Sequence, residues 1–323
     1  MITKSNITRR MSKIKKLSSI ILSGVIFFLC TYYVIRYFQW SAISQLLVHV
    51  DWKLMPITVI VTILFFWLFR TMRWFILLKA AGIKVNFFYL YLVSSISVAF
   101  AIITPFQSGE TLKVELLKKI GILERVPGYG IFVTERILDL IIVLLMAMLN
   151  IVFGASKFLD RGIMFSAFGL ILICFLIFFI IVRQVSPDNA VGRFFQPFNQ
   201  CVKNGKILAS VVILTIGGWF FIVMGWYASL RSISISINLL ETTAMTAVTT
   251  ILGIISLIPW SLGISEISIF SFLSYLKKDI PLAQAGAFIV RMYGVVTLII
   301  GFVHLLIWKF VRIRKQIPGS NKS

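Results

Sequence analysis

Residues 87–110 read FFYLYLVSSISVAFAIITPFQSGE, an apolar run that ends at Pro105 and Gly109 and is followed at once by Glu110. Proline removes a backbone donor and clashes with the preceding helical turn, whereas glycine permits tight turns and close backbone approach. Backbone groups freed by such a break cannot face lipid, so it persists only inside protein or beside a water-filled cavity. We therefore expect a re-entrant segment that enters and leaves a membrane on the same side.

The composition of the chain is that of an integral membrane protein. Of its 323 residues, 59% are hydrophobic and 13% are charged, and the mean hydropathy is +0.98. Soluble domains carry roughly 45–50% apolar and about 25% charged residues. So few charges cannot cover a water-facing surface, which excludes an ordinary cytosolic enzyme, a secreted disulfide scaffold and a disordered protein.

The formal net charge is +21, from 32 basic and 11 acidic residues. In a soluble protein this excess would indicate nucleic acid binding. In a membrane protein, cationic loops set the orientation and lie on anionic lipid head groups, so we expect no nucleic acid partner. The cysteines are odd in number and widely separated, and only two histidines occur, so we expect no disulfide framework, no metal site and no cofactor.

Eight apolar runs follow one another along the chain. They cover residues 17–38, 54–69, 87–104, 129–153, 163–182, 207–230, 241–258 and 284–308. If 87–104 and 241–258 are re-entrant, six full spans remain, and 23 Lys and Arg residues lie on one side against seven on the other. The positive-inside rule favours this arrangement and places both termini in the cytoplasm.

The two re-entrant segments end alike, which indicates an internal repeat. Pro105 and Gly109 each lie 154 residues before Pro259 and Gly263; Glu110 lies 156 before Glu266, and Arg136 lies 155 before Arg291. The two segments open to opposite sides, so the halves, residues 54–153 and 207–308, run through the bilayer in opposite senses. Such inverted repeats with broken helices are typical of secondary transporters. A plain proline kink in an ordinary span is the alternative.

We therefore expect an all-α polytopic membrane protein with one transmembrane domain over residues 17–310. A basic cytoplasmic segment, residues 1–16, precedes that domain, and a basic cytoplasmic tail, residues 311–323, follows it.

Charged side chains within the apolar runs are the candidate functional residues. A charge near the bilayer centre costs about 2.5–3.5 kcal/mol on insertion scales, so unpaired ones are rare. Arg136 and Asp139 are three residues apart and share a helix face. One interpretation is a local ion pair that locks two helices. The other is a polar cavity where a charged ligand meets Glu110, Arg136, Asp139, Glu266 and Arg291.

The arginines and the acidic residues of this set favour different ligands. The planar fork of arginine suits a phosphate, and the carboxylates suit a cation or a proton. Arg70 and Arg73, beside Trp74, are interpreted as snorkelling anchors at the cytoplasmic face, with a lipid head-group site as the alternative. Residues 111–119 are expected to form a short amphipathic interfacial helix.

Recognisable catalytic motifs are missing from the sequence: it contains no P-loop, no Gly-x-Ser-x-Gly elbow and no zinc motif. No stretch is long and polar enough for a soluble catalytic domain. A transferase embedded in the membrane needs only a few polar residues, so it stays an open alternative.

Several motifs occur in order: Arg70-x-x-Arg73-Trp74-x-x-x-Leu78, Pro105-x-x-x-Gly109-Glu110 with Lys113, Glu135-Arg136-x-x-Asp139, and Pro259-x-x-x-Gly263-x-x-Glu266 with the later Arg291. In this order and spacing, over roughly residues 20–310, the chain resembles the lysylphosphatidylglycerol synthase transmembrane-region family, also called flippase-like domain proteins. It departs from the family at Trp260 and Ser261, where additional glycine is usual.

The resemblance implies a lipid-translocating membrane domain. In multidomain members it moves aminoacylated phosphatidylglycerol outward after a cytoplasmic synthase domain has made it, and other standalone members are associated with polyprenyl-linked sugars or other envelope lipids. We expect a standalone member without the synthase domain, so transferase activity is not carried over.

The expected protein is a flippase of the bacterial inner membrane that moves a phospholipid or a lipid-linked saccharide. Its expected partners are phosphate-bearing membrane lipids, an envelope-lipid or glycan synthesis enzyme, and a second copy of itself in a homo-oligomer. A membrane-embedded transferase, or its accessory subunit, acting on a lipid carrier is the alternative.

Overall fold

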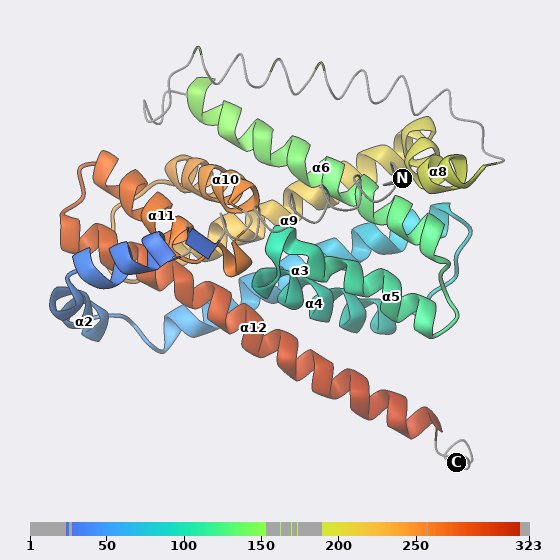
Figure 1. Cartoon of the computed structure of the whole chain (residues 1–323), viewed down its shortest axis with the longest axis horizontal. Helices are drawn as coiled ribbons and strands as arrows, with labels where there is room; N and C mark the ends of the chain where they lie inside the picture. The colour runs from blue at the N-terminus through green and yellow to red at the C-terminus, as the bar shows by residue number, and fades with distance from the viewer. Residues whose placement is uncertain are drawn as a thin grey trace, which may run out of the picture.

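The computed structural model describes residues 24–25, 28–152, 162, 169, 173, 189–256 and 258–316, and within them every regular element is helical (Figure 1). The basic segment 1–16 and most of the apolar run 163–182 lie outside the described residues.

The helices of the first half follow a helical segment at residues 28–37. They are α2 (Trp40–Val48), α3 (Leu54–Ala80), α4 (Phe87–Ile103), the 3-10 helix η1 (Pro105–Thr111), α5 (Leu112–Lys119) and α6 (Arg125–Val152). The second half contains α8 (Ala190–Lys203), α9 (Gly205–Arg231), α10 (Leu239–Ile255), the 3-10 helix η2 (Pro259–Ser261), α11 (Ile264–Tyr275) and α12 (Ile280–Gln316).

Three helices are long and apolar enough to cross a membrane by length and composition: Met55–Ala80, Gly205–Arg231 and Ile280–Val311. The helices α4 and α10 are apolar but shorter, with 17 residues each, which corresponds to about 25 Å. The chain is thus a multi-pass α-helical membrane protein. The exact number of spans stays a prediction.

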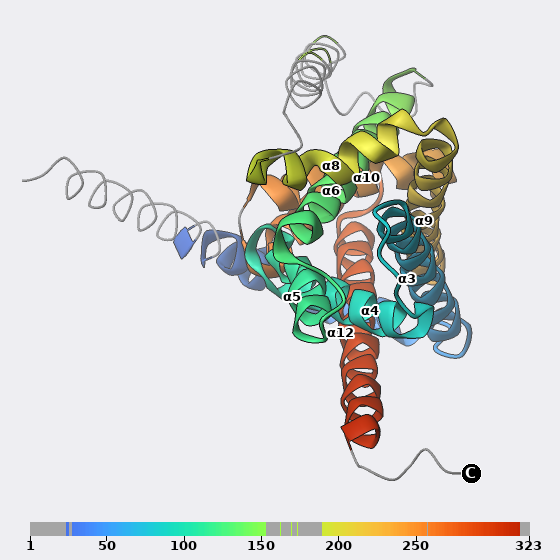
Figure 2. The ribbon, with the colours of Figure 1, turned by 90° about the vertical axis from the view of Figure 1, so that its right-hand side faces the viewer.

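The long helices α3 and α9 pack along each other. The helix α4 packs on α12, and α10 packs on α6. The helices α6 and α12 run in opposite directions across the view of Figure 1. Figure 2 shows that the C-terminal part of α12 projects beyond the other helices. The packing of α3 and α9 is close at Gly217, where an added Cβ would collide with the ring of Phe69.

The first helix break is closely folded. The helix α4 ends at Ile103, Thr104 is extended (φ −109°, ψ 143°), and η1 turns back onto α4. The Thr104 hydroxyl accepts a hydrogen bond from the Gly109 N–H at 2.6 Å. A Cβ at Gly109 would lie 2.5 Å from the carbonyl of Phe100, so only glycine allows this approach.

The second break uses left-handed backbone. Between α10 and α11, Trp260, Ser261 and Gly263 have φ values of 58°, 49° and 81°. Glu266 accepts a hydrogen bond from the Gly263 N–H at 2.8 Å and so closes the N-terminus of α11. The two breaks contact each other through η1 and η2, which brings segments about 154 residues apart to one place.

Helices that hydropathy did not predict complete the fold. The short α2 lies on α12, and α8 lies on α6. Part of the stretch between the apolar runs 163–182 and 207–230 is α8, and the residues after Gly263 form α11. Neither α2 nor α11 is long enough to register as a separate apolar run, and α8 alternates polar and apolar side chains at helical spacing, which lowers its average hydropathy.

Candidate functional site

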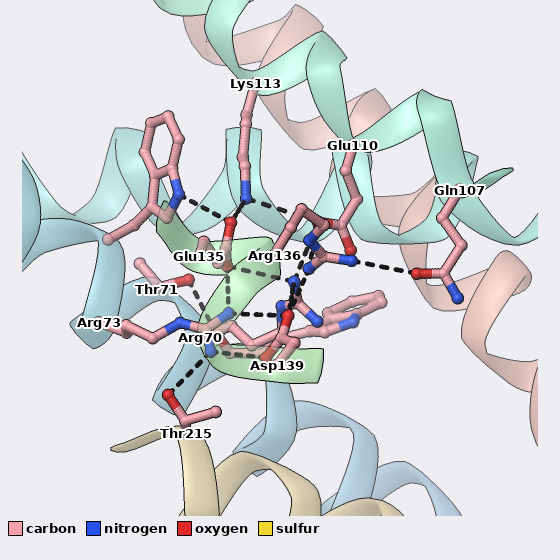
Figure 3. A network of polar contacts seen from close by, with 12 residues as sticks. Arg70, Thr71, Arg73, Gln107, Glu110, Lys113, Glu135, Arg136, Asp139 and Thr215 are labelled. Atoms are coloured by element: carbon pink, nitrogen blue, oxygen red, sulfur yellow. Dashed lines mark hydrogen bonds and ion pairs between the residues drawn. The ribbon is translucent and has the colours of Figure 1, made fainter. Parts of the chain in front are cut away.

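Seven charged side chains meet where α3, η1, α5 and α6 converge (Figure 3). They are Arg70 and Arg73 on α3, Glu110 on η1, Lys113 on α5, and Glu135, Arg136 and Asp139 on α6. We call these seven residues the charged network. Helical spacing explains each local set, since Arg70 and Arg73 are three residues apart and Glu135 and Asp139 are four apart, on one face of their helix.

Glu135 is the most deeply buried carboxylate of the network, with none of its surface exposed. It accepts hydrogen bonds from Arg73 Nη2 at 2.5 Å, from Arg70 Nη2 at 3.1 Å and from Trp74 Nε1 at 2.9 Å. Its Oε2 also pairs with the Lys113 ammonium group. One carboxylate thus joins α3, α5 and α6.

Asp139 lies one turn further along α6. Its two oxygens accept from Arg73 Nη1 at 2.7 Å, from Arg136 Nη2 at 2.6 Å and from Arg70 Nη2 at 3.3 Å. Arg73 Nη1 also donates to Thr215 Oγ1 at 2.9 Å, which ties α9 to the network.

Glu110 reaches the network because η1 folds back after the break. Its Oε2 lies 2.9 Å from Arg70 Nη2, 2.8 Å from Arg136 Nη2 and 3.6 Å from Lys113 Nζ. Gln107 adds a further contact, since its Oε1 accepts from Arg136 Nη1 at 3.1 Å.

The Lys113 ammonium group lies among aromatic rings as well as carboxylates. It is 4.6 Å from the centre of the Trp74 ring and 5.6 Å from that of Phe132. Cation–π contact is strongest where water is excluded, and the Lys113 side chain is only 1% exposed. Lys113 is therefore part of the buried network. The short helix predicted at 111–119 forms as α5, and its position at the membrane interface stays a prediction.

The network contains four cations and three carboxylates, which leaves one excess positive charge. Its own groups fill the space between the helices, and most of its side chains are at most 10% exposed. Arg136 is the exception, with 26% of its side chain exposed. The network therefore has one accessible edge, and that edge is cationic.

A smaller cluster lies at the second break. Arg291 Nε is 3.1 Å from Glu266 Oε1, and Arg291 Nη1 donates to the Trp260 carbonyl and to Ser265 Oγ, both at 2.9 Å. The guanidinium group stacks on the Trp260 ring, 4.3 Å from its centre. We call these four residues the second-break cluster.

The five predicted ligand-binding residues fall into two groups. Glu110, Arg136 and Asp139 meet in the charged network, whereas Glu266 and Arg291 pair with each other. Among the described ion pairs, none joins the two groups, and a common ligand cavity for all five residues stays a prediction. Glu266 accepts a hydrogen bond from the Gly263 N–H at its own helix end.

The burial of Arg70 and Arg73 differs from what the snorkelling interpretation predicts. Their side chains are 8% and 1% exposed and are bonded to carboxylates. The reason is that α3 continues to Ala80, ten residues and about 15 Å beyond Arg70, so both arginines lie inside the bundle. Their role as head-group anchors stays a prediction.

Sequence reasoning also left Glu135, Lys113 and Thr215 out of the site. The signals for the first two were present, because Glu135 precedes Asp139 by four residues and Lys113 follows Glu110 by three. For Thr215 there was no local signal, since its partner Arg73 is 142 residues away.

An open pocket of about 540 Å³ lies elsewhere, at the turn between α5 and α6. Its lining includes Lys118, Gly121, Glu124 and Arg125. Arg125 also forms an exposed ion pair with Glu115 at 2.9 Å. Hydrogen bonds from Arg125 and Tyr129 lower the pKa of the Glu115 carboxyl group.

In the described part of the chain, no three His, Cys, Asp or Glu side chains are grouped as metal ligands.

No curated protein matches the chain. A family match, to the lysylphosphatidylglycerol synthase TM region, covers residues 20–303, which include the charged network and the second-break cluster. The chain therefore belongs to the lysylphosphatidylglycerol synthase TM region family, whose members are integral membrane proteins of lipid metabolism.

Proposed function

We propose that this protein translocates a phospholipid or a lipid-linked saccharide between the leaflets of the bacterial inner membrane. The observation that carries the proposal is the contact between two broken helices inside an apolar bundle, each break flanked by an Arg–Glu ion pair whose glutamate is buried. Buried charges and irregular backbone at membrane depth are costly and are typical of transport pathways.

An inverted repeat is part of the proposal, and the helix contacts support it. Two contacts of the first half with the second have counterparts in the reverse direction: α4 packs on α12 as α10 packs on α6, and α2 packs on α12 as α8 packs on α6. On this basis each repeat also includes the short helix before its long span, α2 or α8, and is longer than the halves 54–153 and 207–308.

The loops that lead into the re-entrant helices support the repeat as well. Asn86 caps α4, and Asn238 caps α10, each through its side-chain oxygen. Before these caps, Gly82 and Ser234 both have positive φ values, and the N–H of the residue after each donates to a carbonyl five residues earlier. Two similar turns at a constant offset of 152 residues favour duplication over coincidence.

In the proposed topology α4 and α10 are re-entrant from opposite sides, six helices cross fully, and both termini are cytoplasmic. The candidate head-group ligands are Glu110, Arg136, Asp139, Glu266 and Arg291, with Arg70 and Arg73 as anchors. A passing head group would exchange with the internal partners of these side chains, so the network would have to open at its exposed edge, Arg136. The partners are phosphate-bearing membrane lipids and an enzyme of envelope synthesis that supplies the lipid.

The test is a leaflet-resolved assay in proteoliposomes. Fluorescent phosphatidylglycerol, phosphatidylethanolamine and a lipid-linked saccharide are each followed by chemical quenching of the outer leaflet. We expect the wild-type protein to accelerate exchange of at least one of them and the variants E110Q, E266Q and R136A to lower this rate by about tenfold or more, the cost of one charge-assisted contact.

The matched control is R125A, which removes an exposed arginine outside the network and should leave the rate unchanged. Each variant is first checked for a monodisperse, folded protein. E266Q is the most informative, because Glu266 has one ion-pair partner among the described residues. Unchanged rates in all three variants would reject the site. A covalently changed lipid after incubation with labelled lipid and donor would instead support the transferase.

A further inference from the structure

The two arginines at corresponding positions after the breaks differ in how fully their guanidinium groups are bonded. Arg136 donates through Nη1 to Gln107 and through Nη2 to Glu110 and Asp139. Both terminal nitrogens of Arg136 are therefore occupied, and two carboxylates balance its charge. Only its Nε, close to the aliphatic chain, lacks a partner among the described residues.

One terminal nitrogen of Arg291 has no hydrogen-bond partner among the described residues. Its Nε faces Glu266, and its Nη1 is used by the Trp260 carbonyl and Ser265. Its Nη2 is buried, and no described residue accepts a hydrogen bond from it. The second oxygen of Glu266 is already committed to the Gly263 N–H and to Ser265. This N–H₂ group, with two donors, is thus left without an acceptor among the described residues.

Trp260 holds the guanidinium group in this orientation. Its ring covers one face of Arg291 at 4.3 Å, and its carbonyl accepts from Nη1 at 2.9 Å. Trp260 makes both contacts with φ 58° and ψ 8°, a backbone conformation that is strained for a bulky residue. Strain of this kind persists where the surrounding structure requires it and is concentrated at ligand sites.

We propose that Arg291 Nη2 binds an anionic phosphate oxygen at the second break, and that Trp260 is the positioning residue that clamps Arg291 for this contact. Arg136 is already paired with Glu110 and Asp139, so it can contact a head group only after the network opens, whereas Arg291 Nη2 has no described partner to give up. This inference rests on the proposed function for the source of the phosphate, a lipid head group. The two halves then have different roles. The charged network holds the first break in place, and Arg291 at the second break binds the anion.

The experiment measures ligand-induced thermal stabilisation of the purified full-length protein in detergent. The probes are dioleoylphosphatidylglycerol, dioleoylglycerol with the same acyl chains and no phosphate, and inorganic phosphate alone. A ligand that binds only the folded protein raises Tm in a concentration-dependent way. We expect a rise with the phospholipid and none with dioleoylglycerol. A rise with inorganic phosphate alone, of equal size, would support the anion site and assign it to free phosphate.

The variants separate a positioning role from a structural one. W260G removes the ring and relieves the backbone strain, so we expect an unchanged or higher Tm without lipid, and about a tenfold higher phospholipid concentration for the half-maximal shift. W260F should restore the wild-type response, because it keeps a ring over the guanidinium group. R291K should lose the response, whereas the matched R125K, at an exposed arginine outside both clusters, should keep it.

A wild-type response in W260G or R291K would overturn the proposal, and so would equal stabilisation by dioleoylglycerol or no phospholipid response in the wild type. The proposed function fails separately: a phosphate-dependent shift without any leaflet exchange in proteoliposomes would reject translocation and leave the anion site standing.

Discussion

At the scale of the residue, Glu135 holds the charged network together, although Arg136 beside it is the more conspicuous charge in the sequence. Three cations and the Trp74 indole converge on its two oxygens. Removing one partner of a buried ion pair leaves uncompensated charge and costs about 3–5 kcal/mol. We therefore expect E135Q to lower the Tm of the purified protein strongly and to reduce the yield of monodisperse protein.

The matched control for that prediction is E115Q, the same substitution at a carboxylate of an exposed pair. Exposed pairs are screened by solvent, so E115Q should leave Tm unchanged. Equal Tm values for E135Q and the wild type would mean that the buried network contributes nothing to stability.

At the scale of the element, the first break depends on how closely η1 approaches α4. A Cβ at Gly109 would lie 2.5 Å from the carbonyl carbon and oxygen of Phe100, and backbone atoms cannot rotate away. Overpacking of this kind costs about 1–3 kcal/mol or more. G109A should therefore lower Tm and displace Glu110 from Arg70 and Arg136, with loss of lipid exchange in the proteoliposome assay.

G205A is the control for this element, because Gly205 has no neighbouring atom within 4 Å of an added Cβ and no positive φ. Its Tm should equal or slightly exceed that of the wild type, since alanine restricts the unfolded chain. A G109A protein as stable as G205A would show that η1 does not pack as described.

At the scale of the whole molecule, the proposed topology predicts which side of the membrane each break opens to. Lys119 ends α5 and Lys277 follows α11, and both are exposed. After replacement of the native cysteines, K119C should label from the cytoplasm and K277C from outside. Lys84 and Lys53 flank the full span α3, so K84C and K53C identify the two sides independently.

The expected pattern groups K119C with K84C, and K277C with K53C. If α4 crossed the bilayer completely, K119C would label with K53C instead. Labelling of K119C and K277C on the same side would refute the inverted arrangement, whatever the lipid assays show.

The sequence by itself determined that this is a membrane protein, that it is helical, and where two of its helices stop. Composition shows that it is a membrane protein, because 13% charged residues cannot cover a soluble surface. The length of the apolar runs shows that it is helical. Pro105 and Pro259 show where two helices stop, since the effect of proline on its own backbone is local. The same local logic placed Arg136 and Asp139 on one helix face.

Only the tertiary structure decided which charges meet. Arg73 pairs with Glu135 across 62 residues and with Thr215 across 142, and both contacts depend on how α3 packs against α6 and α9. Helical periodicity specifies neighbours within one or two turns and carries no information about the facing helix. For that reason the sequence grouped five residues into one cavity, whereas packing divided them between a buried charged network and the Arg291 cluster at the second break.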